Sequence, residues 1–162
     1  MRKDPAFYEE PTNSVGFLAR LTFRAFARAL ERRTIKKGVT IGQWRFLRVL
    51  WVEDGLTQRE LSRRVGLREP TTVTALRSME RDGLILREQS SQDRRRVHVY
   101  LTTKAKRLRR GLLPAVAEVN KIAAAGIPDA DLDTLQRTLM QIVANLAAEE
   151  GEGGDAASEE AP

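Results

Sequence analysis

The sequence predicts a mainly α-helical protein with a small β-hairpin. Hydrophobic residues make up 41% of the chain but aromatic residues only 6%, and a sheet protein usually contains more aromatic and β-branched side chains. Apolar side chains recur at intervals of three and four residues in several segments, which indicates helices buried on one face. From Val97 to Leu101 apolar and polar side chains alternate instead, as they do in an amphipathic strand.

One globular domain fits a chain of 162 residues. We expect it over residues 14–148, after a flexible N-terminal arm at 1–13 that contains two prolines. Residues 149–162 contain six acidic side chains, no basic ones and no bulky apolar ones. Such a segment cannot offset its ordering entropy by burial, so we expect a disordered acidic tail.

Two helices are expected in the first third of the domain. The first spans residues 14–37, where apolar side chains recur at helical spacing, and Gly38 ends it. The second begins after Thr40, because Thr40 and Gln43 form the pattern of a capping box. Asp54-Gly55 closes this second helix.

A pair of short helices comes next. Thr57 and Glu60 form a second capping box, and Gly66 stops the helix that it opens. Pro70 fits the first turn of the following helix, where a missing N–H breaks no hydrogen bond, and Gly83 ends that helix. Its expected buried stripe is Val73, Leu76 and Met79. Two short helices joined by a Gly-containing turn are typical of a helix-turn-helix.

A two-stranded hairpin with an arginine-rich tip follows the helix pair. We expect its strands at 84–87 and 97–101, joined by a polar turn at 90–96. Residues 40–102 then form a winged helix-turn-helix. The fold class is therefore mainly α, with a small β-hairpin wing.

Two long helices complete the domain, from Thr103 to about Ala125 and from Asp129 to about Ala148. Their apolar stripes, like that of the first helix, would stay exposed in a lone protomer. We therefore interpret 14–37 and 103–148 as dimerisation helices.

The charge distribution points to a polyanionic partner. The formal net charge is +6, and residues 57–110 contain fifteen Lys and Arg against six Asp and Glu. A surface this basic attracts nucleic acid through Coulomb forces and counterion release. The alternative interpretation of such a run is a solvated surface that binds nothing.

Several function classes lack the residues they need. The chain has no cysteine and one histidine, His98, so we expect no metal site and no cofactor. No apolar run approaches the length of a membrane span, which predicts a cytoplasmic protein. No Gly-rich phosphate loop and no nucleophile paired with a base is evident, so we expect no enzymatic activity.

The sequence resembles the MarR family of bacterial regulators, and its SlyA-like members in particular. The most specific match is the wing pattern from Asp93 through Arg95 to Leu101-Thr102. Further matches are the turn from Leu61-Ser62 to Gly66-Leu67 and the junction from Met79-Glu80 to Gly83-Leu84-Ile85. One departure is Ser90, where the family commonly has an acidic residue or Asn; it puts the local hydrogen bonding of the wing in question.

The resemblance implies two groups of DNA-binding residues. The helix after Pro70 would be the recognition helix in the major groove, reading bases from its N-terminal half. Arg95 would enter the minor groove, Arg94 and Arg96 would contact phosphates, and Asp93 would orient an arginine. The alternatives are threonines that only cap the helix or touch phosphates, and arginines that are solvated turn charges. The candidate residues are Arg68, Thr71, Thr72, Thr74 and Arg77 on the helix and Asp93, Arg94, Arg95 and Arg96 on the wing.

A candidate effector pocket lies between the first two helices. Family members often bind phenolic or aryl carboxylate ligands there, and the second helix places aromatic and cationic side chains on one side. The alternative is that both tryptophans only pack the core. The candidates are Phe17, Arg20, Arg24, Trp44, Arg45, Arg48 and Trp51.

The sequence thus predicts a homodimeric regulator of transcription that binds double-stranded DNA. The resemblance implies a repressor released by a small phenolic, aryl carboxylate or aryl thioester effector. Two-fold symmetry implies an inverted-repeat operator with half-sites roughly 34 Å apart. The alternative function is an architectural protein that coats DNA with little sequence preference and binds no ligand.

Overall fold

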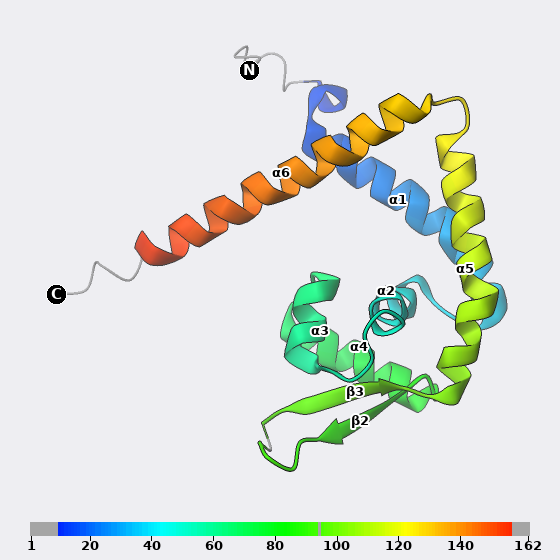
Figure 1. Cartoon of the computed structure of the whole chain (residues 1–162), viewed down its shortest axis with the longest axis vertical. Coiled ribbons are helices and arrows are strands. Elements are labelled where there is room, and N and C mark those ends of the chain that lie inside the picture. Colours follow the sequence, from blue (N-terminus) through cyan, green and yellow to red (C-terminus); the bar gives the residue numbers. More distant parts are fainter. Residues whose placement is uncertain (1–9, 94, 157–162) are drawn as a thin grey trace. The chain divides into compact units, whose positions relative to one another are not determined.

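The computed structural model describes residues 10–93 and 95–156. It divides into two units, Met1–Asn120 and Lys121–Pro162. In the described part of the chain, the first unit contains α1 to α4, most of α5, two short 3-10 helices and a small sheet, while the second contains the end of α5 and all of α6 (Figure 1).

The expected first helix comprises α1 (Val15–Thr34) and a short 3-10 helix, η3 (Ile35–Lys37). Another 3-10 helix, η2 (Pro11–Asn13), precedes α1 and lies within the segment expected to be a flexible arm. The hydroxyl of Ser14 caps α1 by accepting from the backbone N–H of Phe17 at 3.3 Å. Residues 1–9, the rest of the expected arm, lie outside the described residues.

Both predicted capping boxes are present. Thr40 opens α2 (Ile41–Leu50), and its hydroxyl and the Gln43 amide satisfy each other's backbone N–H groups at 3.2 and 3.0 Å. Thr57 and Glu60 do the same at the start of α3 (Gln58–Val65), at 3.2 and 2.9 Å. These local bonds fix where the two helices begin.

The helix-turn-helix consists of α3 and α4 (Glu69–Arg81). Gly66 ends α3 with a φ of 70°, a left-handed conformation that side chains with a Cβ seldom adopt. The backbone N–H of Leu67 then donates to Ser62 O at 3.1 Å, and the Ser62 hydroxyl donates to Leu67 O at 2.5 Å. Ser62 is buried, so these two hydrogen bonds hold the turn between α3 and α4 from its core side.

The sheet has three strands, where the sequence predicts two. β2 (Ile85–Gln89) and β3 (Val97–Leu101) form the expected antiparallel hairpin, with Ile85 opposite Leu101 and Gln89 opposite Val97. The unexpected strand, β1 (Leu56–Thr57), pairs with β3 on its other side, so the order is β1-β3-β2. A strand of two residues has no period for sequence analysis to detect.

Leucines and aromatic side chains from α2, α3, α4 and the sheet form the core of the first unit. Phe46, Leu47 and Leu50 of α2 are at most 1% exposed, as are Leu61 of α3 and Leu76 of α4. Leu30 of α1 and Leu108 of α5 (Thr103–Ala124) pack against this cluster from outside.

The second unit contains α6 (Asp129–Ala156), which extends past the predicted end near Ala148. The helix therefore includes the first half of the segment expected to be a disordered tail, and residues 157–162 lie outside the described residues. In the part of the chain described, no helix is both long and apolar enough to span a membrane.

Replacing Thr57 with Ala should lower the free energy of unfolding by about 1 kcal/mol, because the N-terminal N–H groups of α3 lose their acceptor. Chemical denaturation monitored by circular dichroism measures this change. Thr57→Ser retains the hydroxyl and should restore most of the loss. Thr71→Ala, at an exposed helical position, is the matched control and should change stability by less than about 0.5 kcal/mol.

Candidate nucleic-acid interface

The polar face of α4 is set by burial of its opposite face. Leu76 and Met79 are completely buried, so residues on the opposite side of the helix point outward. The candidate base-reading residues Arg68, Thr71, Thr74 and Arg77 are all exposed. Arg68 is the N-cap residue of α4, and the Thr74 hydroxyl donates to Pro70 O at 3.1 Å.

Thr72 does not belong with these exposed residues. Its side chain is 1% exposed, and its hydroxyl has no hydrogen-bond partner among the residues that the structure describes. The buried stripe of α4 contains Thr72, Leu76 and Met79, whereas Val73, expected in that stripe, is only half-buried. The sequence interpretation misjudged the helical phase by one residue, because Val is the more apolar of two adjacent candidates.

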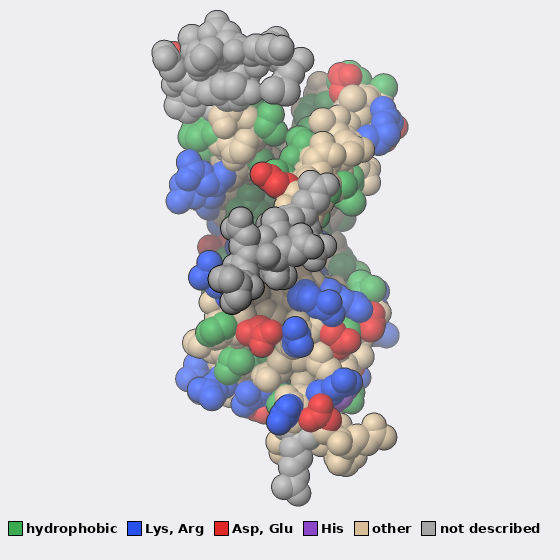
Figure 2. Space-filling view, turned by 90° about the vertical axis from the view of Figure 1, so that its left-hand side faces the viewer, with side chains coloured by type: hydrophobic (Ala, Val, Ile, Leu, Met, Phe, Trp, Pro, Cys, Tyr) green, Lys and Arg blue, Asp and Glu red, His purple; other side chains and the backbone are tan. Residues whose placement is uncertain are grey.

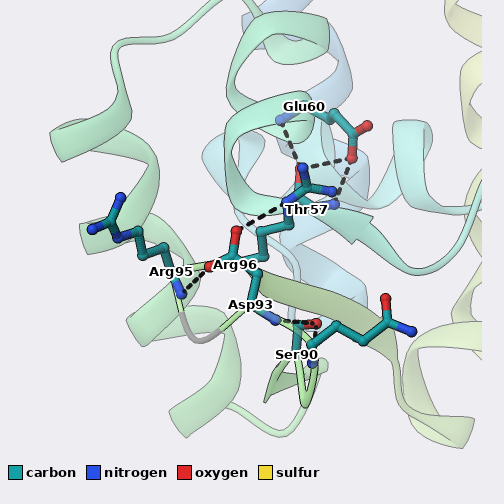
Figure 3. A network of polar contacts seen from close by, with 7 residues as sticks. Thr57, Glu60, Ser90, Asp93, Arg95 and Arg96 are labelled. Carbon is teal, nitrogen blue, oxygen red and sulfur yellow. Dashed lines mark hydrogen bonds and ion pairs between the residues drawn. The ribbon is translucent and has the colours of Figure 1, made fainter.

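Asp93 organises the wing tip. Its carboxylate accepts from the backbone N–H of Arg95 at 2.9 Å and pairs with the Arg96 guanidinium at 3.4 Å (Figure 3). This agrees with the orienting role expected for Asp93, with Arg96 as its side-chain partner. Arg94, a predicted phosphate contact, lies outside the described residues.

Ser90 provides the hydrogen bonds that its departure from the family pattern put in question. Its hydroxyl accepts from the backbone N–H groups of Gln92 and Asp93, both at 3.3 Å. Its own N–H donates to Arg96 O at 2.9 Å, which closes the loop between the strands. Hydrogen bonds from Ser90 on one side and Asp93 on the other therefore hold the backbone of the wing tip in place.

The side chain of Arg95 points away from Asp93 and Arg96 (Figure 3) and lines a polar hollow beside the start of α3. Only its backbone is engaged by Asp93, and the residue is exposed. A fixed backbone with a free guanidinium is the arrangement that insertion into a narrow minor groove requires.

An ion pair that the sequence analysis missed joins the wing to the recognition helix. Arg87 of β2 donates to one carboxylate oxygen of Glu80 on α4 at 2.9 and 2.7 Å. The hydrogen bond from Arg87 lowers the pKa of Glu80 below its ordinary value of 4.5. The sequence gives only a weak signal for this pair: an acidic residue, Glu80, on one predicted element and a basic residue, Arg87, on the next.

Two further acids near this face have partners. Glu69 lies 3.7 Å from Arg59, and Glu60 caps α3, where the Thr57 hydroxyl lowers its pKa. A polar hollow of about 690 Å³ lies between the start of α3 and the wing tip and is lined in part by Arg63, Arg95 and Arg96. Figure 2 shows Lys and Arg side chains, with acidic ones among them, on the lower half of the viewed surface.

A second and more apolar cavity, the α2 pocket, has a volume of about 520 Å³. Four of the predicted effector residues line it: Trp44, Arg45, Arg48 and Trp51. The other three, Phe17, Arg20 and Arg24, do not. The α1 residues that line it are Phe23, Phe26, Ala27 and Leu30, farther along the helix, and α5 adds Arg109, Leu113, Val116, Val119 and Asn120.

The two tryptophans combine both expected roles. Trp44 is only 6% exposed and belongs to the core, yet it also lines the α2 pocket. Trp51 packs edge-on against Trp44 with ring centroids 5.6 Å apart, and its Nε1 donates to Ala105 O of α5 at 3.0 Å. Burial and pocket lining are therefore compatible here.

A bundle of α2, α3 and α4, with an exposed polar face on α4 and an arginine-tipped hairpin after it, defines a winged helix-turn-helix protein. The sequence profile of the MarR family matches residues 39–97. The chain belongs to the MarR family, whose members are transcriptional regulators and not enzymes. The SlyA-like subgroup stays a prediction.

Individual relatives agree with this assignment. The homoprotocatechuate degradative operon repressor of Escherichia coli is 32% identical over 92 residues, which cover 56% of this chain and 62% of that repressor. The crystal structure of transcriptional regulator PA3341 is 33% identical, with 83% of this chain and 99% of that chain covered and a TM-score of 0.74.

The PcaV transcriptional regulator from Streptomyces coelicolor, solved in complex with its natural ligand, is 28% identical. The match covers 85% of this chain and 96% of that chain, with a TM-score of 0.71. Against three matching curated relatives, the chain spans 44%, 66% and 62% of their lengths.

Replacing Thr72 with Val should raise the free energy of unfolding by about 1 kcal/mol, because it removes a buried hydroxyl that has no partner. DNA affinity should stay unchanged, since the side chain faces the core. Denaturation and fluorescence anisotropy with labelled DNA measure the two quantities. A loss of DNA affinity in a fully folded variant would return Thr72 to the set of base contacts.

Proposed function

We propose that this protein is a homodimeric repressor of transcription that binds an inverted-repeat DNA operator and is released by a small aromatic effector. The observation that carries the proposal is the joint presentation of the polar face of α4 and the free Arg95 guanidinium. The Glu80–Arg87 ion pair, at 2.7 Å, joins the elements that bear them. Because its proposed partner is chromosomal DNA, we place its action in the cytoplasm.

The recognition helix and the wing divide the work of DNA binding. Arg68, Thr71, Thr74 and Arg77 would face base edges, where arginine pairs best with guanine O6 and N7. Arg95 would enter the minor groove, and Arg94 and Arg96 would contact phosphates. Asp93 has its carboxylate committed to the tip and is a positioning residue.

Exposed apolar side chains support dimerisation through the terminal helices. On α1, Val15, Leu18 and Leu21 are 55%, 42% and 49% exposed. On α6, Leu135, Leu139 and Leu146 are 51%, 42% and 57% exposed. Monomeric proteins seldom leave such stripes in water, so we propose that a second copy covers both helices.

The α2 pocket supports the proposed effector. Its volume of about 520 Å³ lies in the range of small-molecule sites, and aromatic and cationic side chains line it together. One relative is the repressor of a homoprotocatechuate degradative operon, which supports aromatic chemistry, and a similar regulator was solved in complex with its natural ligand, which supports effector binding. We propose that Trp44, Trp51 and Arg48 contact this effector.

Selection of bound sequences from a random duplex pool tests the proposal against the architectural alternative. A two-fold symmetric motif with half-sites about one helical turn apart would support a dimeric, sequence-specific regulator. Binding to every sequence with the same steep dependence on salt would instead support an architectural protein.

Replacing Arg95 with Ala should weaken operator binding by about 1 to 3 kcal/mol, because one minor-groove contact is lost. The fold should be retained, since the Arg95 side chain is exposed and forms no ion pair or side-chain hydrogen bond with the described residues. Fluorescence anisotropy gives the affinity, and circular dichroism checks folding. Arg20→Ala, on α1, is the control and should bind as the wild type does. Unchanged affinity in the Arg95 variant would remove this residue from the interface.

A further inference from the structure

Helix α1 carries three arginines, Arg24, Arg28 and Arg32, that form a row along one face of the helix. They follow one another at intervals of four residues, and all three are exposed. None of them lines the α2 pocket, and none forms an ion pair with the residues that the structure describes. Like charges one helical turn apart repel each other, so this arginine row favours an anionic partner.

The charges of α1 itself do not neutralise the arginine row. Glu31 is the single acid of α1 and lines a small hollow with Arg28 and Arg32. Within residues 10–93 and 95–156 it forms no ion pair. The next arginine, Arg33, has its own partner in Glu118 of α5 at 2.9 Å. Three guanidinium groups of the row therefore face one carboxylate.

The arginine row shares its side of the molecule with exposed apolar side chains. Leu21 lies three residues before Arg24 and is 49% exposed, while Ile35 lies three residues after Arg32 and is 53% exposed. The proposed function has a second copy cover α1. A guanidinium that is covered loses its hydration, and only a paired anion offsets that cost. The covering element must therefore bring carboxylates to this face.

The acidic tail, residues 149–162, has the matching charge. It contains six Asp and Glu and no Lys or Arg. Leu146, which is 57% exposed, lies three residues before Glu149, so the tail continues directly from the exposed apolar stripe of α6. Carboxylates near the C-terminal end of a helix are unfavourable, because the helix dipole is negative there, and no basic residue lies in the last turn of α6. The tail thus lacks a counter-charge at the end of its own helix.

The acids at the other end of α6 are differently placed. Asp129 and Asp131 lie in the first turn of α6, where the positive end of the helix dipole stabilises a carboxylate. They therefore already have a favourable electrostatic environment within their own helix. The acidic tail is the part of α6 that gains most from a row of arginines.

We propose that the acidic tail of one copy binds the arginine row on α1 of a second copy. This inference rests on the proposed function, in which α1 and α6 are covered by a second copy. Two-fold symmetry forms the contact twice in each dimer. The contact strengthens the dimer, and it also keeps the negative charge of the tail away from the DNA-binding face.

Subunit exchange of the full chain tests the contribution of the tail. Preparations labelled at the N-terminus with a donor or an acceptor dye are mixed, and energy transfer reports mixed dimers. Neutralising the tail should speed dimer dissociation at least about tenfold at low salt, because several ion pairs are lost twice. The difference should disappear at about 1 M salt, where charges are screened beyond about 3 Å. The substitutions are Glu149→Gln, Glu150→Gln, Glu152→Gln, Asp155→Asn, Glu159→Gln and Glu160→Gln.

A double-mutant cycle identifies the partner of the tail. Neutralising the arginine row with Arg24→Gln, Arg28→Gln and Arg32→Gln should speed dissociation by a similar factor. Combining both sets should add little, since each set removes the same ion pairs. The control set, Asp129→Asn with Asp131→Asn, should combine with the row variant additively. Circular dichroism checks that every variant folds. If the effects of tail and row are additive instead, the proposal is wrong.

Carbodiimide cross-linking shows which copy supplies the tail. Arg28→Lys retains the charge of the row and introduces an amine that carbodiimide joins to a carboxylate in contact with it. We expect a product of dimer mass with position 28 linked to the tail, identified by mass spectrometry. Links only within one chain would overturn the assignment to a second copy. Arg81→Lys, at an exposed position of α4, is the control, and links from it in place of position 28 would show that the tail binds the recognition helix.

The outcomes separate this inference from the proposed function. If no energy transfer appears even after the two labelled preparations are unfolded and refolded together, the chain forms no dimer, and the proposed homodimer fails together with the inference. If mixed dimers form and neutralising the tail leaves their dissociation unchanged, only the contact between tail and arginine row is wrong. Selection of bound DNA sequences tests operator binding independently of either result.

Discussion

Helix α2 forms the apolar centre on which both candidate sites depend. Phe46, Leu47 and Leu50 are at most 1% exposed, and side chains from α3, α4 and the sheet surround them. Burying three side chains of this size contributes roughly 5 to 9 kcal/mol, which is comparable to the whole stability of a small domain. The recognition helix is anchored on this core, while Trp44, Arg45 and Arg48 of the same helix line the α2 pocket.

Ion pairing then determines which arginines stay free. In the winged part, Glu80 engages Arg87, Asp93 engages Arg96 and Glu69 lies near Arg59. Exposed pairs of this kind add little to stability, usually less than about 1 kcal/mol each. Their effect is on geometry, because Glu80–Arg87 joins the wing to α4 and Asp93–Arg96 lies within the wing tip.

Local sequence signals predicted most of the fold correctly. Each capping box is encoded by two residues three positions apart, so Thr40 and Thr57 locate the starts of α2 and α3 without any knowledge of packing. The hairpin was predictable because alternation over Val97–Leu101 is a property of that segment alone. Strand β1 was missed because its two residues become a strand only by pairing with β3.

The errors at the candidate sites have a different origin, since they depend on how helices rotate and slide against one another. Thr72 and Val73 are adjacent, and only packing against the core decides which of them is buried. The sequence analysis placed the α1 side of the pocket too near the start of the helix, at Phe17 instead of Phe23. Residue spacing predicts which face of a helix is buried, but it does not predict which turn of that helix lies beside the pocket. Arg109 was missed altogether, since its position follows from contacts of α5 with α2 that no local pattern encodes.

A physical connection between the two sites begins in the first turn of α2. The Gln43 amide caps that helix and also donates to Asp82, the C-cap residue of α4, at 2.6 Å. Lys104 of α5 donates to the Asp82 carbonyl at 2.8 Å, so α2, α4 and α5 meet at one residue. A ligand between α2 and α5 changes DNA affinity only to the extent that it binds two arrangements of these helices with different affinity. By linkage, operator DNA must then change the affinity for the ligand by the same factor.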